Sequence, residues 1–322
     1  AVRAAGLQSF LSSILYFGAS VPFGFQAAAK MQEGPGTDGA FFSEVAKRKG
    51  HRMRFNLTSA VLNVLFPWLT FVAVFATMSF SIFYRWPGLA FLVVFLALVA
   101  PMICGAFAIR NERRGAAPDW LKFSAIALLV SVLAGLVLGL GNHSTNMKPF
   151  YDIDTLNEYE GVDPSKAKGQ ALMDAGRITF APGSYLATNM SMGFKNLDVY
   201  CVAPVMKTRD QKVVDFWAVG MNCCQGVGAF RCGDYANGKA RSGLRLLKED
   251  QRPFFRLAAQ QAEAAFGIVA PHPLFFYWMQ DPENEMSGFR NNGWNNFWMW
   301  TWAVLVIQVI AVAAFSALQM RK

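Results

Sequence analysis

The segment Asp198–Asp234, DVYCVAPVMKTRDQKVVDFWAVGMNCCQGVGAFRCGD, holds four of the five cysteines in the chain. Two short runs in it, Val199–Val202 and Val213–Val219, alternate in the manner of β-strands, and glycines follow the second run. An even set of cysteines in a compact strand-rich region is typical of a two-disulfide framework, which persists in oxidising compartments. We therefore expect a disulfide-stabilised α+β domain built around this segment.

The four cysteines are Cys201, Cys223, Cys224 and Cys232. A disulfide between the adjacent residues Cys223 and Cys224 would be strained, so each is expected to bond a distant partner. Two pairings remain open: Cys201 with Cys223 and Cys224 with Cys232, or Cys201 with Cys224 and Cys223 with Cys232. A zinc site is the alternative, but the chain has only three histidines and no CxxC motif. The fifth cysteine, Cys104, is expected to pack within an apolar helix.

Four apolar runs indicate a membrane protein: Leu57–Tyr84, Leu89–Ile109, Trp120–Leu140 and Phe297–Leu318. Each is long enough to cross a hydrocarbon core of about 30 Å as a helix. The chain is 54% hydrophobic, well above an ordinary soluble protein. The last run starts in an aromatic cluster typical of a membrane interface, formed by Trp294, Phe297, Trp298, Trp300 and Trp302.

The net charge of +9 is unevenly distributed. Residues 145–293 contain 16 Lys/Arg and 16 Asp/Glu, so the excess of positive charge flanks the apolar runs. We therefore expect no nucleic-acid partner, because that would need a basic face on the folded domain. Basic residues are concentrated before the first run, in the loop 110–114 and at the C-terminus. This distribution favours a cytoplasmic or stromal location for these three segments.

These signals divide the chain into four parts. Residues 1–56 form a cytoplasmic or stromal segment with a basic helix at 41–54, and 57–144 form three transmembrane helices. Residues 145–293 form the lumenal or extracellular disulfide domain, and 294–322 form the fourth transmembrane helix with a basic tail. The positive charges and the disulfides independently place the domain on the same side of the membrane.

The N-terminal residues allow two interpretations. The absence of an initial methionine predicts a removed presequence, although a trimmed chain would look the same. Residues 4–29 are uncharged and long enough to span a bilayer, but Gly18, Pro22 and Gly24 interrupt the helical pattern. We favour a segment that lies on the membrane surface or binds a partner.

Inside the outer domain, Asp163 and Pro164 predict a helix that begins there and runs to about residue 175. Residues 177–219 are strand-rich, and 253–266 predict a second helix with one apolar face. The apolar run 274–278 follows a Pro-His-Pro sequence and is expected to be rigid. Asn142 and Asn189 begin Asn-X-Ser sequons that face the outer side.

Three further features are candidate sites. Gly135 and Gly139 form a GxxxG motif beside Ala134, which predicts close packing against a helix of this chain or of a partner. His143 and His272 are candidate ligands for a pigment at the membrane surface, although we favour purely structural roles for both. No metal site is expected.

The sequence shows no catalytic constellation of nucleophile, base and acid. The four runs contain no Asp, Glu or Arg, and their one lysine, Lys122, is the third residue of its run. Pumps and coupled transporters usually need ionisable groups at membrane depth, so neither class is favoured.

Several strings resemble a large family of multi-span membrane proteins of dinoflagellate algae whose function is unassigned. They cover about 90 residues of the outer domain and, with it, the last apolar run: YCVAP at 200–204, DFWAVG at 215–220, NCC at 222–224, FRC at 230–232, RLAAQQAEA at 256–264 and HPLFF at 272–276. The resemblance implies an algal source, and hence a thylakoid lumen as the oxidising compartment. It provides no catalytic or binding residues.

We therefore expect a non-catalytic accessory or scaffolding subunit of a larger membrane complex, with a photosystem–light-harvesting supercomplex of the thylakoid as the specific expectation. Chlorophyll, carotenoid or lipid bound at the spans would fit that role, and the partners would be other subunits and the bilayer. The alternative is a receptor-like binding protein of the cell surface or endomembranes. A glycan on Asn189 would distinguish the second from the first.

Overall fold

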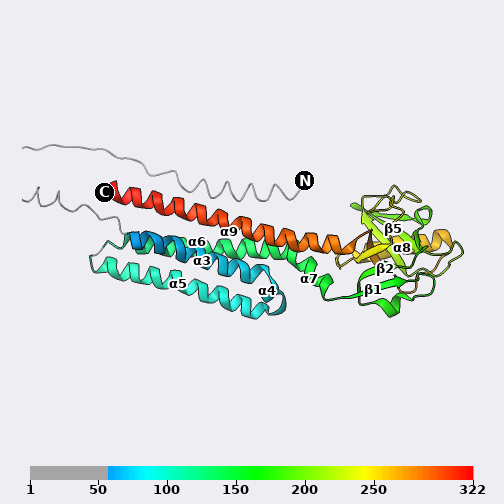
Figure 1. The fold of residues 1–322 in the computed structure, drawn as a ribbon, viewed down its shortest axis with the longest axis horizontal. Coiled ribbons are helices and arrows are strands. Elements are labelled where there is room, and N and C mark those ends of the chain that lie inside the picture. Colours follow the sequence, from blue (N-terminus) through cyan, green and yellow to red (C-terminus); the bar gives the residue numbers. More distant parts are fainter. Residues whose placement is uncertain (1–56, 116, 322) are drawn as a thin grey trace, which may run out of the picture. The chain divides into compact units, whose positions relative to one another are not determined.

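The computed structural model describes residues 57–115 and 117–321. The predicted basic helix at 41–54 and the apolar segment 4–29 lie outside these residues. Four described helices are long and apolar enough to cross a membrane (Figure 1), as expected: α3 (Leu57–Ser79), α5 (Pro87–Arg113), α6 (Asp119–Asn142) and α9 (Pro282–Arg321).

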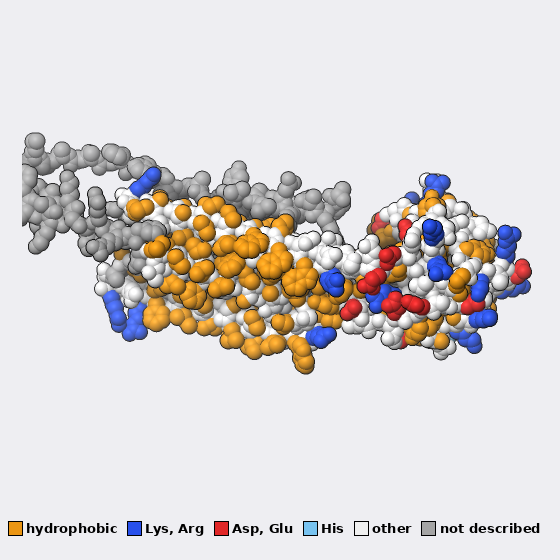
Figure 2. Space-filling view, in the orientation of Figure 1, with side chains coloured by type: hydrophobic (Ala, Val, Ile, Leu, Met, Phe, Trp, Pro, Cys, Tyr) orange, Lys and Arg blue, Asp and Glu red, His pale blue; other side chains and the backbone are white. Residues whose placement is uncertain are grey.

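These helices form a bundle in which α6 packs against α3 and α5, and α9 packs against α3. The interior consists of large apolar side chains, including Phe71, Phe75 and Phe297, which pack as one cluster. Many large apolar side chains on the outside of the bundle are exposed. Figure 2 shows them spread over the helices, whereas charged side chains lie at the helix ends and over the sheet domain. Lys122 lies at one such end, where its ammonium group pairs with Glu112 at 2.7 Å.

The first apolar run is less regular than the sequence predicts, and the helix of the third run continues beyond the predicted end. Phe80 is extended and separates α3 from a short helix, α4 (Ser81–Arg85). Its ring stacks on Trp294 at 4.3 Å, so the break is held by packing against α9. The chain then continues past α6 through a π-helix, η2 (His143–Met147), into α7 (Lys148–Asp154).

Helix α9 begins well before the fourth apolar run, within the residues that the sequence predicts to belong to the outer domain. Asp281 accepts a hydrogen bond from the backbone amide of Asn284 at 3.1 Å, and Pro282 occupies the first turn. A capping carboxylate and an early proline both favour helix initiation. Residues 282–296 therefore form about 22 Å of mostly polar helix that leads into the apolar part.

The outer domain contains an eight-stranded mixed sheet in the order β1-β2-β7-β8-β6-β5-β3, with β4 also paired to β5. The pairs β1–β2 and β6–β8 are parallel and the others are antiparallel. The strands are β1 (Asn157–Val162), β2 (Ala175–Phe180), β3 (Tyr185–Leu186), β4 (Met192–Asn196), β5 (Asp198–Met206), β6 (Phe216–Met221), β7 (Ser242–Arg245) and β8 (Leu274–Met279).

Both faces of the central strands are buried. Consecutive residues of β5, such as Cys201 and Val202, point to opposite faces of the sheet and enter two different apolar clusters. Helix α8 (Arg252–Phe266) covers one face with Phe255 and Ala258. Loops, including the segment with the other three cysteines, cover the opposite face. The α+β class and the helix predicted at 253–266 are confirmed.

The helix predicted from Asp163 to about residue 175 is wrong. The amide of Ala167 donates to the carbonyl of Asp163 at 2.9 Å, but this single turn ends at Lys168, which is extended. A short 3-10 helix, η3 (Gly169–Leu172), and then β2 follow. A second 3-10 helix, η4 (Thr188–Met190), lies farther along the chain. Asp163 and Pro164 therefore begin a turn and not the predicted helix, because pairing of β2 with β1 and β7 prevailed over helix propensity.

The sheet contacts the helices through a small apolar cluster. Ile153 of α7, Leu244 of β7 and Met286 of α9 are all buried in it. Beside them, the guanidinium of Arg177 pairs with Glu158 at 3.1 Å and with Glu283 of α9 at 2.7 Å. Two chain connections, this cluster and the ion pair between Arg177 and Glu283 therefore attach the sheet to the helices.

Candidate functional site

The cysteines form the second of the two predicted pairings. Cys201 on β5 bonds Cys224, and Cys223 bonds Cys232. Asn222 has a left-handed backbone, with φ of 58°, immediately before the two adjacent cysteines. This turn directs the next two side chains to different partners, which the sequence could not reveal.

Two glycines on the strands beside β5 make room for the disulfides. A Cβ at Gly220, which pairs with Cys201, would lie 2.6 Å from the sulfur of Cys223. A Cβ at Gly193, on the other neighbouring strand, would lie 2.8 Å from the sulfur of Cys224. Any larger residue at either place would displace a sulfur atom.

The sulfurs of Cys201, Cys223 and Cys232 lie within 4.8 Å of one another, a spacing that a metal ion could also use. All three belong to disulfides, however, and metal binding requires free thiolates. In the oxidised protein the cluster is therefore a structural brace for the loop that covers this face of the sheet. Cys104 of α5 is a free thiol.

Asp215 is a buried carboxylate that holds two distant loops by their backbones. One oxygen accepts from the amide of Gly169 at 2.8 Å and the other accepts from the amide of His272 at 3.0 Å. A Cβ at Gly169 would overlap the carbonyl oxygen of His272, so this contact requires glycine. The carboxylate therefore replaces water for two amides that would otherwise be unpaired. His272 itself is exposed, and its described contact is through its backbone.

His143 lies in the π-helix and is 6% exposed. Its Nδ1 is 3.1 Å from the carbonyl oxygen of Ser79 at the end of α3, and its ring meets the edge of Phe83 with centroids 4.8 Å apart. These contacts join the ends of α3, α4 and α6. Pigment binding by His143 or His272 stays a prediction, whereas the contacts described are structural for both.

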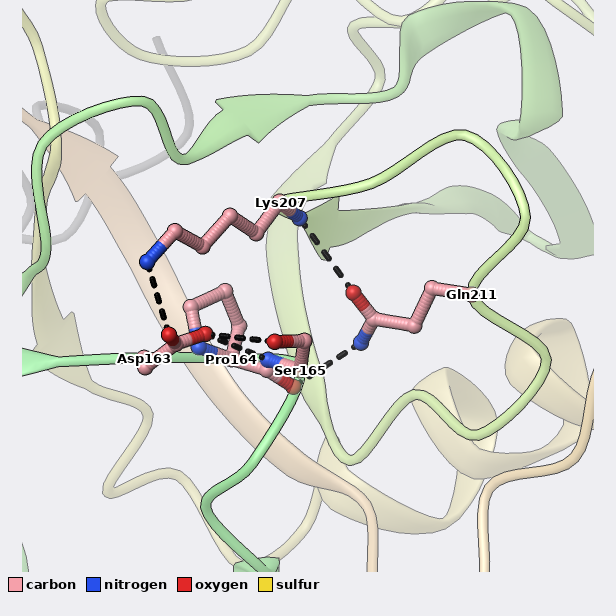
Figure 3. Close-up of polar contacts among 5 residues, drawn as sticks. All are labelled: Asp163, Pro164, Ser165, Lys207 and Gln211. Carbon is pink, nitrogen blue, oxygen red and sulfur yellow. Dashed lines mark hydrogen bonds and ion pairs between the residues drawn. The ribbon is translucent and has the colours of Figure 1, made fainter.

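A surface network connects β5 to the turn after β1 (Figure 3). The ammonium of Lys207 pairs with Asp163 at 2.7 Å, and the other oxygen of Asp163 accepts from the hydroxyl of Ser165 at 2.6 Å. Gln211 bridges the same elements, donating to the carbonyl of Pro164 at 2.8 Å and accepting from the amide of Lys207 at 3.2 Å. The Lys207 ammonium, followed by Ser165, lowers the pKa of Asp163 to about 2.

The predicted GxxxG face packs on a helix of the same chain. A Cβ at Gly139 would lie 2.6 Å from the Cβ of Met78, and one at Gly135 would lie 3.1 Å from the carbonyl of Phe71. Ala134 packs beside them against α3 and α9. The small residues are thus used within the bundle, and the alternative of a partner helix at this face is not needed.

Polar side chains within the bundle also bridge helices. Gln308 of α9 donates to the carbonyl of Asn63 at 2.8 Å, and Asn63 bonds the hydroxyl of Ser124 on α6. At the other end, Asn142 donates to the carbonyl of Gly293 at 3.1 Å and accepts from Asn296 at 3.0 Å. Asn142 is buried, so it is unsuitable as a glycan acceptor in the folded protein, whereas Asn189 is exposed.

A cleft of about 390 Å³ opens beside the start of α9. Its carboxylates are already engaged: Glu158 and Glu283 pair with Arg177, and Asp281 caps α9. The rest of the lining is cationic or neutral: Thr179, Lys239, Arg241, Ser242, Gln280 and Pro282. The hydroxyls of Thr179 and Ser242 in this lining lie 3.1 Å apart and bond each other.

Burial shifts the pKa values of two other side chains on the sheet, Arg245 and Tyr277. The Arg245 guanidinium lies over the Phe276 ring, 5.6 Å from its centroid, and burial lowers its pKa. Burial, with a smaller effect from Asp250, raises the pKa of the Tyr277 hydroxyl. Arg245 lies on β7 and Tyr277 on β8, and both side chains are partly buried.

Comparison with known proteins adds no assignment, because no family model, curated protein or solved structure matches this chain. The resemblance to the algal family therefore stays an expectation.

The sequence did not reveal the structural roles of Asp215 and Asn222 in the outer domain. In the sequence, Asp215 and Asn222 stand out only as parts of the DFWAVG and NCC strings. Asn is the non-glycine residue that best tolerates a left-handed backbone, so its position before two cysteines was a usable signal. Asp215 gave no comparable signal, because its partners are amides far away in sequence.

Proposed function

We propose that this protein is a non-catalytic integral membrane subunit that presents its disulfide domain to a partner within a larger complex. One observation carries the proposal. Among the described residues, eight acids and amides hold elements of the structure together: Asp163, Asp215, Asp234, Asp281, Asn63, Asn142, Asn222 and Gln308. An enzyme would need some of these groups free to face a substrate.

The proposed topology has four spans, with the sheet domain on the lumenal or extracellular side. Contacts between Gln319 and Asp119 bring the start of α6 and the end of α9 together, at the end of the bundle that also carries Arg110, Arg113 and Arg114. The sheet is attached at the opposite end, through α7 and α9. The positive-inside tendency then supports a cytoplasmic or stromal location for the C-terminus.

The specific complex that we propose is a photosystem with its light-harvesting proteins in a thylakoid membrane. Support comes from the algal resemblance and from the exposed apolar faces of α5 and α9, which suit neighbouring helices, pigments or lipid tails. A receptor-like protein of the secretory pathway is the second candidate. The exposed sequon at Asn189 is the feature that favours it.

The test is a native purification from membranes in a mild detergent, with the size of the particle, its absorbance spectrum and the mass of the Asn189 peptide measured together. The proposal expects a large pigmented particle with an unmodified Asn189. A small colourless particle with a glycan on Asn189 would support the receptor. Catalytic turnover by the purified chain would contradict both.

A further inference from the structure

The two disulfides lie side by side on one face of the sheet. Cys201 on β5 pairs with Gly220 on β6, and paired residues of neighbouring strands project to the same face. Gly220 has no side chain, and a Cβ there would lie 2.6 Å from the sulfur atoms of both Cys223 and Cys232. The second disulfide therefore occupies the space over Gly220, next to Cys201. The sulfurs of Cys201, Cys223 and Cys232 accordingly lie within 4.8 Å of one another.

The four bonded cysteines differ in their access to solvent. Cys201, Cys224 and Cys232 are buried in the core cluster on this face. Cys223 is only partly buried, and it stands at the base of a loop whose residues 225–228 are exposed. A reductant in solution therefore reaches the disulfide between Cys223 and Cys232 first, at the Cys223 sulfur.

Reduction at Cys223 places a new nucleophile inside the cluster. In thiol–disulfide exchange a thiolate attacks one sulfur of a disulfide, and the other sulfur leaves as a thiolate. Attack by a dithiol on Cys223 forms a mixed disulfide there and releases Cys232 as a thiolate. The second thiol of the dithiol then displaces Cys223, so the reductant leaves with its own disulfide and Cys223 becomes a thiol. The Cys232 thiolate is left within 4.8 Å of the Cys201 sulfur.

We infer that the two disulfides form a relay, in which the Cys232 thiolate attacks Cys201 and forms a disulfide with it. Cys224 leaves as a thiolate that takes a proton from water. Overall, one dithiol is oxidised, one protein disulfide is reduced, and the remaining disulfide moves to a new pair of cysteines. The substrate is a dithiol that can reach Cys223 at the surface. The step is stoichiometric, and the inference goes beyond the proposed function without depending on it.

The exchange moves the bond that attaches the loop 223–232 to the sheet. In the oxidised protein β5 holds the first part of this loop through Cys224, whereas after exchange it holds the last residue, Cys232. Residues 225–228 then no longer lie within the short ring that Cys223 and Cys232 close. The loop remains covalently attached to the sheet, so the relay changes the loop without removing both disulfides.

The test treats the full-length chain in detergent with one equivalent of dithiothreitol at about pH 8, where a cysteine thiol is partly ionised. Acid then stops the exchange, N-ethylmaleimide blocks the free thiols, and the linked peptides are identified by mass spectrometry. Trypsin places the cysteines in three peptides: Cys201 in 196–207, Cys223 with Cys224 in 213–231, and Cys232 in 232–239.

The expected main product that retains one disulfide is peptide 196–207 joined to 232–239, with maleimide on both cysteines of 213–231. If 196–207 remains joined to 213–231 and Cys232 carries maleimide, Cys232 does not attack Cys201 and the inference is overturned. A link to Cys104, the free thiol of α5, would show random scrambling and would also overturn it.

The variant Cys223→Ser tests the same step without a reductant, because it leaves Cys232 as a thiol from the start. The inference expects 196–207 joined to 232–239 in part of the purified variant, beside chains that keep the original link to 213–231. A folded variant in which Cys201 is joined to Cys224 alone would overturn the inference. The wild-type measurement decides if the variant does not fold.

Discussion

The helix bundle and the sheet domain are stabilised in different ways. In the bundle each helix satisfies its own backbone, and the helices are joined by small residues and by a few amide side chains such as Asn63 and Gln308. In the sheet the strands satisfy one another, and two disulfides with the buried Asp215 fix the loops that cover them. The bundle should therefore tolerate treatments that disrupt the domain.

The largest expected effect comes from removing the disulfides. Loss of one native disulfide typically costs about 2–5 kcal/mol, and reduction of both should unfold the sheet while the helices persist. The measurement is circular dichroism in detergent before and after treatment with a phosphine reductant. Loss of helical signal in step with the strands would show that the two regions are not independent.

Cys201 and Cys224 enclose a longer loop than Cys223 and Cys232, with sequence separations of 23 and 9. The double variant Cys201→Ser/Cys224→Ser should therefore lower the free energy of unfolding more than Cys223→Ser/Cys232→Ser. Thermal unfolding of the two variants, followed by tryptophan fluorescence, checks this order.

The substitution Asp215→Asn should have the next largest effect on the stability of the sheet domain. The new amide nitrogen would face a backbone N–H of Gly169 or His272, so a buried donor loses its acceptor. We expect a loss of about 2–3 kcal/mol in the free energy of unfolding of the domain. Asp210→Asn, at an exposed position in the loop after β5, is the matched control and should leave the denaturation midpoint unchanged. Equal midpoints for the two variants would refute the role given to Asp215.

Gly139→Ala acts on the bundle instead. Its new Cβ would lie 2.6 Å from that of Met78, so α6 and α3 must separate, at a cost of about 1–2 kcal/mol. Gly141→Ala in the same helix has open space and should be neutral or slightly stabilising. The thermal midpoint of the helical signal should fall for the first variant alone. A fall for both would point to helix propensity rather than to close packing.

The smallest effect concerns pH. Because the folded pKa of Asp163 is about 2, below its ordinary 3.8, its pair with Lys207 stabilises the fold fully above pH 4. That contribution should disappear as the pH falls from about 4 to about 2. The thermal midpoints of wild type and Asp163→Asn should therefore converge over this range. A difference that persists at pH 2 would mean that Asp163 acts through packing and not through its charge.

The comparison also explains where prediction from sequence succeeded. The four apolar helices and the helix at 253–266 were predicted because their patterns are local and continuous. The strand at 274–279 was noted only as a rigid apolar run, since a strand buried on both faces lacks the alternation that identifies a half-exposed one. The N-terminal part of α9 was missed because its residues are polar and its helix depends on a cap and on packing by Met286.

The sequence by itself determined the helices long and apolar enough to cross a membrane, the α+β class of the domain and the participation of four cysteines in disulfides. Hydrophobic length and residue chemistry are properties of a segment alone, so they can be read without partners. Only the tertiary structure decided which cysteines pair and which helix the Gly135–Gly139 face contacts. It also decided that the chain at Asp163 forms a single turn and not the predicted helix. Each of these depends on contacts between residues far apart in the chain, such as Cys201 with Cys224 or Gly139 with Met78, and no local pattern encodes which distant residues meet.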